Sequence, residues 1–227
     1  MHADRDAYQA FHRERHQMIA SLLEAHVPER KTRLLDIGGG GDVGALSTLL
    51  RERIASEMFA VELEGDVERA RERGVTAHDC DVDESPLPFA DEFFDVILFA
   101  SVIEHLYSPH RVLREIERVL RPGGLLLLEA PNAVSLGRRI DALTGQNPFR
   151  WFNEYNAFKR HARMEYCSVF YTAEEVAVLL AESFEIVEIR YGMHLPPANI
   201  VKRAIRKLCA TLWPRTSDCF AVLARRK

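Results

Sequence analysis

Short apolar runs alternate with helix-forming segments through the first 130 residues of this 227-residue chain. The runs expected to form strands are 33–37, 58–63, 75–80, 93–101 and 125–130, and the expected helices between them are 45–54, 66–73 and 111–120. Strands that alternate with helices through short turns build a parallel sheet with helices on both faces. Segment 93–101 is apolar on both sides, which is typical of a strand at the centre of such a sheet.

The two ends of the chain add to this pattern. A helix over 5–26 precedes the first strand, and the later elements are a helix 173–183 capped by Thr172, a strand 184–192, a helix 198–212 and a strand 219–226. These additions bring the number of expected strands to seven. We therefore predict an α/β fold with a doubly wound, mostly parallel seven-stranded sheet.

Charge and cysteine usage exclude several classes of protein. The formal net charge is −4, so no overall basic character indicates nucleic acid. Eight basic residues against Asp218 give 196–227 a charge of +7, which leaves −11 elsewhere. The four cysteines show no zinc-ligand spacing, and we expect buried, reduced thiols. The N-terminus lacks an apolar signal core and no run reaches transmembrane length, which favours a cytoplasmic protein.

Four consecutive glycines, Gly38–Gly41, lie between the first expected strand and the following helix. A glycine-rich turn at this place lets a ligand approach bare backbone. A dinucleotide is one candidate, because Gly39-x-Gly41-x-x-Gly44 is a formal G-x-G-x-x-G and an acidic residue, Glu62 or Glu64, follows about twenty residues later. S-adenosylmethionine is the other candidate, since it shares the adenosine but carries no phosphate.

Two carboxylates beside the glycines favour the second candidate. Asp36 closes the strand and Asp42 stands at the start of the helix, where a pyrophosphate would otherwise bind. Both would repel a pyrophosphate and suit the ammonium group of S-adenosylmethionine. Asp42 as a simple helix N-cap is the alternative interpretation.

Four motifs strengthen this reading. They are "LLDIGGGG", "FAVEL", "DCDVDESPLPFADEFFDVILFASVIEHL" and "VLRPGGLLLLEAPN", in this order between 33 and 132. In them the chain resembles the class I S-adenosylmethionine-dependent methyltransferases, in particular the small-molecule, type 11-like branch. The resemblance implies one Rossmann-like domain over 1–227. Its expected parts are an N-terminal helical cap 1–30, a cofactor-binding core 31–131, a helical and aromatic lid 132–171, and the C-terminal part of the sheet 172–227.

The resemblance also implies the role of individual residues toward S-adenosylmethionine and its product S-adenosylhomocysteine. The expected contacts are Asp36, Gly38 and Gly40 to the methionine half, Glu62 with Leu63 to the ribose, Asp81 and Val82 to the adenine, and Ala100 to the sulfonium region. A carboxylate such as Glu62 accepts hydrogen bonds from both ribose hydroxyls. The alternatives are a solvated strand end for Glu62 and a shifted register for Asp81 between two other aspartates. The family's third glycine is replaced by Asp42.

The candidate catalytic residue is His105, which follows the fourth strand in "SVIEHL". Histidine titrates near neutral pH and suits a general base for methylation at oxygen. A purely structural hydrogen bond from His105 is the alternative. Relatives with E-x-x-E-H bind a divalent metal here, but Ser101 stands in place of the first carboxylate. We therefore predict that no metal is required.

The segment 149–171 is expected to form the acceptor pocket. It holds eight of the twenty aromatic residues of the chain, with basic residues between them. This composition favours a small-molecule, glycan-like or lipid-precursor acceptor, although the segment is equally compatible with a lid that only packs over the sheet. The functions left open beside methyl transfer to such an acceptor are a nucleic-acid methyltransferase, a non-catalytic S-adenosylmethionine-binding protein and an NAD-dependent oxidoreductase.

The helix expected over 198–212 carries apolar residues at a spacing of three to four and basic residues on its other face. Its apolar stripe either packs on the domain or lies at an anionic membrane surface. A strand must follow and return to the sheet, which favours packing.

Overall fold

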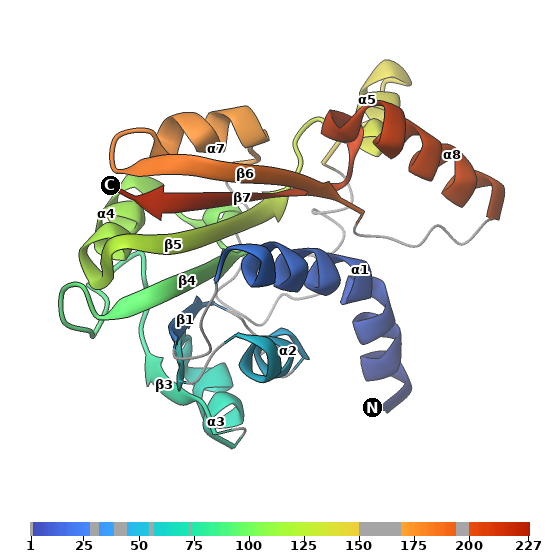
Figure 1. Cartoon of the computed structure of the whole chain (residues 1–227). Coiled ribbons are helices and arrows are strands. Elements are labelled where there is room, and N and C mark those ends of the chain that lie inside the picture. The colour runs from blue at the N-terminus through green and yellow to red at the C-terminus, as the bar shows by residue number, and fades with distance from the viewer. Residues whose placement is uncertain are drawn as a thin grey trace.

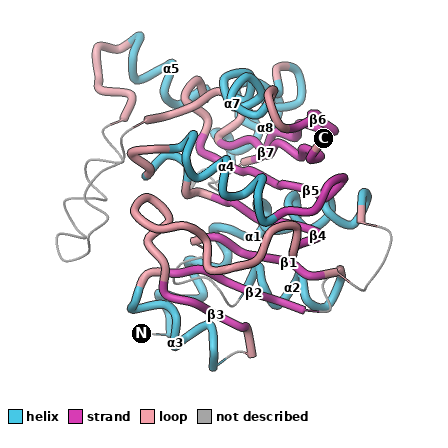
Figure 2. Tube along the Cα trace, turned by 90° about the vertical axis from the view of Figure 1, so that its left-hand side faces the viewer, coloured by secondary structure: helices cyan, strands magenta, loops and turns pink. Residues whose placement is uncertain are grey.

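The computed structural model describes residues 2–27, 32–38, 45–54, 57–72, 74–149, 169–193 and 200–227. Its seven-stranded sheet has the order β3-β2-β1-β4-β5-β7-β6, which Figure 2 shows as strands lying one above another. The strands are β1 (Arg33–Ile37), β2 (Glu57–Glu62), β3 (Thr76–Asp79), β4 (Phe94–Ala100), β5 (Leu120–Pro131), β6 (Phe184–Gly192) and β7 (Cys219–Arg226). Strands β1 to β5 pair in parallel, and β7 is antiparallel to both β5 and β6. The predicted α/β, mostly parallel seven-stranded sheet is confirmed.

Helices cover both faces of the sheet, as Figure 1 shows. The described helices are α1 (His2–His26), α2 (Ala45–Arg53), α3 (Glu64–Glu72), α4 (Pro109–Val119), α5 (Leu136–Leu143), α7 (Ala173–Leu180) and α8 (Ile200–Leu212), of which α5 and α8 lie beyond the end of the sheet. Successive strand residues point to opposite faces, so Leu34 packs with α1, α2 and α3, whereas Leu35 packs with α4 and α7. The sheet is therefore buried on both sides, as its apolar central strands predict.

The junction between α4 and β5 differs from the sequence prediction. The glycines after Arg121 were expected to separate helix from strand, but β5 begins at Leu120 and runs through them. The pairing of β4 with β5 shifts register between Phe94 and Val96, and Gly123 has φ 74°. A bulge accommodates this extra length, and the glycine supplies the left-handed conformation that it needs.

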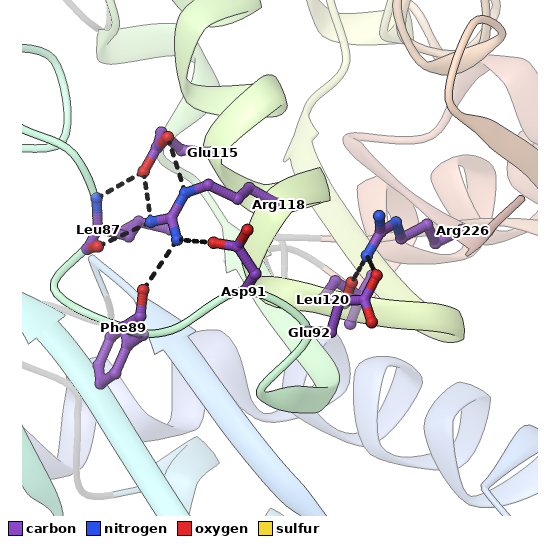
Figure 3. A network of polar contacts seen from close by, with 8 residues as sticks. All are labelled: Leu87, Phe89, Asp91, Glu92, Glu115, Arg118, Leu120 and Arg226. Carbon is purple, nitrogen blue, oxygen red and sulfur yellow. Dashed lines mark hydrogen bonds and ion pairs between the residues drawn. The ribbon is translucent and has the colours of Figure 1, made fainter.

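Arg118 of α4 holds the loop 80–93, as Figure 3 shows. Its guanidinium donates to the carbonyl oxygens of Leu87 and Phe89 at 3.0 and 2.9 Å, and it forms ion pairs with Glu115 and Asp91. The hydrogen bond to Glu115 and that to Asp91 raise the pKa of Arg118 above its usual range. Helix α4 thereby fixes the path of this loop.

The segment between β5 and α7 leaves the sheet and returns to the same place. Asn132 and Tyr171 form a parallel β-bridge, and the N–H of Ala133 donates to the carbonyl oxygen of Tyr171 at 2.9 Å. Thr172 caps α7 through a reciprocal capping box with Glu175, which confirms the predicted cap. Residues 150–168, nearly half of the predicted lid 132–171, lie outside the described residues.

Helix α8 leaves part of its predicted apolar stripe exposed, as far as its side chains are described. Figure 1 shows it extending away from the sheet, and Leu208 and Leu212 are 59% and 58% exposed. Trp213 directly after the helix is 62% exposed. Packing of the stripe on the domain was the favoured interpretation, and it is wrong for these side chains because a turn at Pro214–Thr216 lets β7 return without drawing the helix onto the core. Among the described residues, no helix is long and apolar enough to cross a membrane.

Candidate functional site

The carboxyl ends of the five parallel strands meet at one edge of the sheet, and the predicted cofactor residues gather there. The strand order reverses between β1 and β4, and the crevice outside such a reversal is where open α/β sheets bind ligands. Every described member of the predicted set comes from the end of a strand or from the residues after it. A surface hollow of about 320 Å³ between Glu57 and Gly74 lies at the amino ends of β2 and β3, at the opposite edge. It is not part of this site.

Gly38 lies directly after β1 at this reversal. Its φ is 66°, and a Cβ atom added there would lie 2.8 Å from Cγ2 of Val102, which follows β4. Its N–H donates to the carbonyl oxygen of Val61 at 2.9 Å, so the turn is tied to β2. The backbone is bare and close-packed here, which fits a bound ligand. Gly40 and the neighbouring Asp42 lie outside the described residues.

Two carboxylates end the neighbouring strands. Asp36 of β1 and Glu62 of β2 are each only 3% exposed. A buried carboxylate at the end of β2 agrees with an acceptor for the two ribose hydroxyls and disagrees with a solvated strand end. Leu63 follows Glu62 and is 41% exposed, so it presents an apolar surface at the same edge. The residues present therefore fit the adenosine half of S-adenosylmethionine.

The loop after β3 carries the pair predicted to contact adenine. Asp81 accepts a hydrogen bond from the N–H of Asp83 at 3.0 Å, which forms a local turn, and Asp83 in turn accepts from the N–H groups of Tyr107 and Ser108. The carbonyl oxygen of Val82 accepts from Arg111 of α4 at 2.7 Å. These contacts distinguish Asp83 from Asp81. Asp83 holds the loop, whereas Asp81 is half-buried beside the carboxyl edge of the sheet.

A buried polar network follows the end of β4 at Ala100. Arg15 of α1 donates to Oε2 of Glu129 at 2.7 Å and to Oγ of Ser101 at 2.9 Å, and Ser101 donates to the same Glu129 oxygen at 3.0 Å. Glu129 is fully buried in β5, and Ser101 has φ 55°, a strained conformation for a residue other than glycine. The network joins α1 to the ends of β4 and β5.

Glu104 lies beside this network in the short turn Ile103–His105. It is 1% exposed, and among the described residues no other group forms a hydrogen bond with either carboxylate oxygen. Burial raises the pKa of Glu104 from 4.5 to about 8, and the negative charge of Glu129 adds to the rise. Its own backbone N–H, Arg15 and Arg138 act in the opposite direction without offsetting the burial. The site thus holds a carboxyl group that titrates near neutral pH.

The sequence prediction placed this chemistry on His105. The structure places His105 half-buried at the end of the same turn, where its backbone N–H donates to the carbonyl oxygen of Val102 at 2.9 Å. Sequence reasoning did not single out Glu129, whose signal is an acidic residue inside the otherwise apolar run "LLLLEA". In the described segments, no group of three or more His, Cys, Asp or Glu side chains is arranged to hold a metal ion. That no metal is required stays a prediction.

Aromatic side chains lie next to Arg138 of α5. The rings of Phe149 and Phe170 stack with their centroids 4.5 Å apart. The guanidinium of Arg138 lies 4.2 Å from the Phe170 centroid and 5.1 Å from that of Phe149. The described residues of the predicted lid 132–171 therefore include stacked aromatic rings beside the basic Arg138, and the basic residues of 149–171 lie outside the described residues.

Comparison with known proteins agrees with this geometry. Residues 35–128 match the family model described as "Methyltransferase domain". The chain is 31% identical to the ubiquinone biosynthesis O-methyltransferase of Agrobacterium fabrum over 63% of this chain and 59% of that protein. It is 32% identical to the 2-methyl-6-phytyl-1,4-hydroquinone methyltransferase 2 of rice over 49% of this chain and 32% of that protein. The chain thus spans between a third and three fifths of these two relatives.

A solved structure with the same fold is N-methyltransferase NodS from Bradyrhizobium japonicum in complex with S-adenosylhomocysteine. It has a TM-score of 0.61 and 19% sequence identity, over 95% of this chain and 87% of that one. The matched segment and the relatives resemble class I S-adenosylmethionine-dependent methyltransferases, and the solved structure supports the fold alone. These similarities favour S-adenosylmethionine over a dinucleotide at the glycine run.

The first prediction concerns the buried ion pair. Removing one partner leaves the other charge buried and uncompensated, so Arg15→Met should lower the free energy of unfolding by about 3–5 kcal/mol. The matched control is Arg53→Met, because Arg53 pairs with Glu24 at an exposed position, where a pair contributes at most about 1 kcal/mol. Urea unfolding measures both. Equal losses in the two variants would contradict a structural role for the Arg15–Glu129 pair.

The second prediction concerns the pH dependence of stability. The pKa of Glu104 rises from 4.5 to about 8 on folding, so the folded protein keeps a proton that the unfolded chain releases. The free energy of unfolding therefore falls as pH rises from about 4.5 to 8, by about 1.4 kcal/mol for each unit of pKa shift. Glu104→Gln should be more stable than the parent protein at pH 8, and the difference should vanish toward pH 4.5.

Urea unfolding at pH 5, 6.5 and 8 checks this expectation, with the exposed Glu57→Gln as the control. A difference between Glu104→Gln and the parent that does not change with pH would show that Glu104 titrates normally.

Proposed function

We propose that this protein transfers the methyl group of S-adenosylmethionine to a small-molecule acceptor at oxygen. The observation that carries the proposal is the buried Glu62 carboxylate next to the bare backbone of Gly38 at the strand-order reversal. The proposed cofactor contacts are Asp36, Gly38, Gly40, Glu62, Leu63, Asp81, Val82 and Ala100. The cofactor supplies an activated methyl group, and the protein aligns the acceptor and excludes water, an effect worth roughly 7–11 kcal/mol.

The acceptor class is inferred from the relatives and the aromatic groups near α5. Both named relatives act, by their names, on quinone-type compounds, and the stacked Phe149 and Phe170 offer an aromatic surface on the acceptor side. These observations favour a phenolic acceptor over the glycan-like one that the sequence also allows. The division into cap 1–30, core 31–131, lid 132–171 and C-terminal part 172–227, and the cytoplasmic location, remain proposals from the sequence.

Two other functions remain distinguishable from this one. A nucleic-acid methyltransferase would need basic residues around the site, whereas the ends of β1 and β2 carry the buried acids Asp36 and Glu62. A non-catalytic protein would bind the cofactor without methyl transfer to any phenol.

The third prediction tests the cofactor site. Glu62→Gln should weaken binding of S-adenosylhomocysteine by about tenfold or more, because hydrogen bonds to a charged acceptor contribute about 1.5–3 kcal/mol each. Glu57→Gln at the exposed amino end of the same strand is the matched control and should bind as the parent protein does. Titration calorimetry measures both. No binding by the parent protein would refute the proposed function, and equal affinities would remove only Glu62 from the site.

The exposed face of α8 supports contact with an anionic membrane surface, where lipid-like acceptors are found. Leu208, Leu212 and Trp213 are exposed, and the helix sequence includes Lys202, Arg203, Arg206 and Lys207. Exposed leucine and tryptophan beside several cations fit the boundary between lipid headgroups and acyl chains.

The fourth prediction is that the protein sediments with anionic vesicles at low salt and not at high salt, since each cation near the surface contributes about 1 kcal/mol. Changing Lys202, Arg203, Arg206 and Lys207 together to Glu should abolish this binding, and vesicles of neutral phosphatidylcholine should bind little. Protein that stays in the supernatant with anionic vesicles at low salt would exclude the contact without affecting the enzymatic proposal.

A further inference from the structure

Glu104 is a buried carboxyl group that the fold does not explain. Its exposure is 1%, and within the described part of the chain neither buried carboxylate oxygen has a hydrogen-bond partner from another residue. Burying a polar group without such a partner opposes folding, so each instance calls for a reason. Replacement of Glu104 by an apolar residue would relieve that penalty, which indicates that stability is not what this side chain provides.

The surroundings of Glu104 are the elements that frame the acceptor side. The charged or titratable groups that face it are Arg15 of α1, Glu129 of β5, Arg138 of α5 and Tyr171 before α7. Cys219 of β7 faces the same Arg15 and Glu129, and burial raises the pKa of its thiol. Arg15 is bonded to Glu129, whose side chain also holds Ser101, directly after Ala100. Glu104 therefore lies beside the polar network that follows Ala100, the residue predicted to face the sulfonium.

We propose that Glu104 accepts the proton of the acceptor's hydroxyl group during methyl transfer. This inference rests on the proposed function. The acceptor oxygen forms its bond to the methyl carbon as the methyl–sulfur bond breaks. The sulfur keeps the electron pair of the broken bond, and the hydroxyl proton passes to a carboxylate oxygen of Glu104. The product is a methyl ether beside a neutral carboxylic acid, which later releases its proton to water.

The chemistry of the group suits this role better than that of an ordinary carboxylate. A general base is most effective when its pKa lies near the working pH, and burial raises the pKa of Glu104 to about 8. A cation placed near a buried carboxyl group favours the charged form. Cationic S-adenosylmethionine should therefore ionise Glu104 on binding, whereas neutral-sulfur S-adenosylhomocysteine should do so less.

His105 was the base predicted from the sequence, and it provides the natural comparison. It belongs to the same turn, but it is half-buried, whereas Glu104 is withdrawn from water. Variants at the two positions therefore separate the two assignments.

The deciding experiment measures proton release on cofactor binding and needs no acceptor. Titration calorimetry at pH 7 is run with S-adenosylmethionine and with S-adenosylhomocysteine, each in two buffers of different ionisation enthalpy. The parent protein should release up to about one proton more with the cationic ligand. Glu104→Gln should bind both ligands and lose this difference, and His105→Gln should keep it. A difference that persists in Glu104→Gln, or disappears in His105→Gln, would overturn the proposal. Absence of binding to either ligand would instead refute the proposed function.

A kinetic arm uses catechol as the probe phenol and labelled S-adenosylmethionine. In the parent protein, the transfer rate should fall about tenfold per pH unit below the pKa of the loaded site, and Glu104→Gln should lower the rate by about 10²–10⁴-fold and flatten the profile. His105→Gln should keep the shape of the profile. If a chelator abolishes activity and added Mg²⁺ restores it, Glu104 would be assigned to metal binding, and the proposal would be overturned. The calorimetric arm decides the matter where catechol is not methylated.

Discussion

The ion pair between Arg15 and Glu129 joins the N-terminal helix to the centre of the sheet, and the geometry of the site depends on it. Both side chains are buried, and they meet Ser101 at the point where β4 ends. Desolvating two charges is costly, so such a pair contributes more to where the elements lie than to net stability. Here it sets α1 against the carboxyl edge of the sheet, where the strand order reverses.

The same pair determines the electrostatics of Glu104. Arg15 is already bonded to Glu129, and Arg15 and Arg138 together lower the pKa of Glu104 by less than burial raises it. Glu104 therefore keeps its proton to a pKa of about 8. A fold that leaves a carboxyl group without a partner loses stability, and such local costs are characteristic of functional sites. Helix α4, through Arg118 and Arg111, holds the opposite wall of the site.

Local patterns in the sequence determined most of the architecture. The apolar runs of β1, β4 and β7 and the alternation of helix and strand follow from burial and periodicity, which neighbouring residues suffice to show. Gly38 and Glu62 were found because backbone conformation and strand ends leave local traces in the sequence. The extension of β5 through the glycines after Arg121 was missed, because a bulge depends on its partner strand.

Only the tertiary structure decided which polar residues act together. Arg15 and Glu129 are 114 residues apart, and nothing local to either residue indicates that they meet. The sequence favours His105 for proton transfer because histidine titrates near neutral pH, but packing buries the adjacent Glu104 and leaves His105 partly open. Likewise, the apolar stripe of α8 is fixed by sequence, whereas its exposure depends on where the turn at Pro214–Thr216 directs the chain. Residue type sets the chemistry that is available, and long-range packing sets the solvation and charge that decide its pKa.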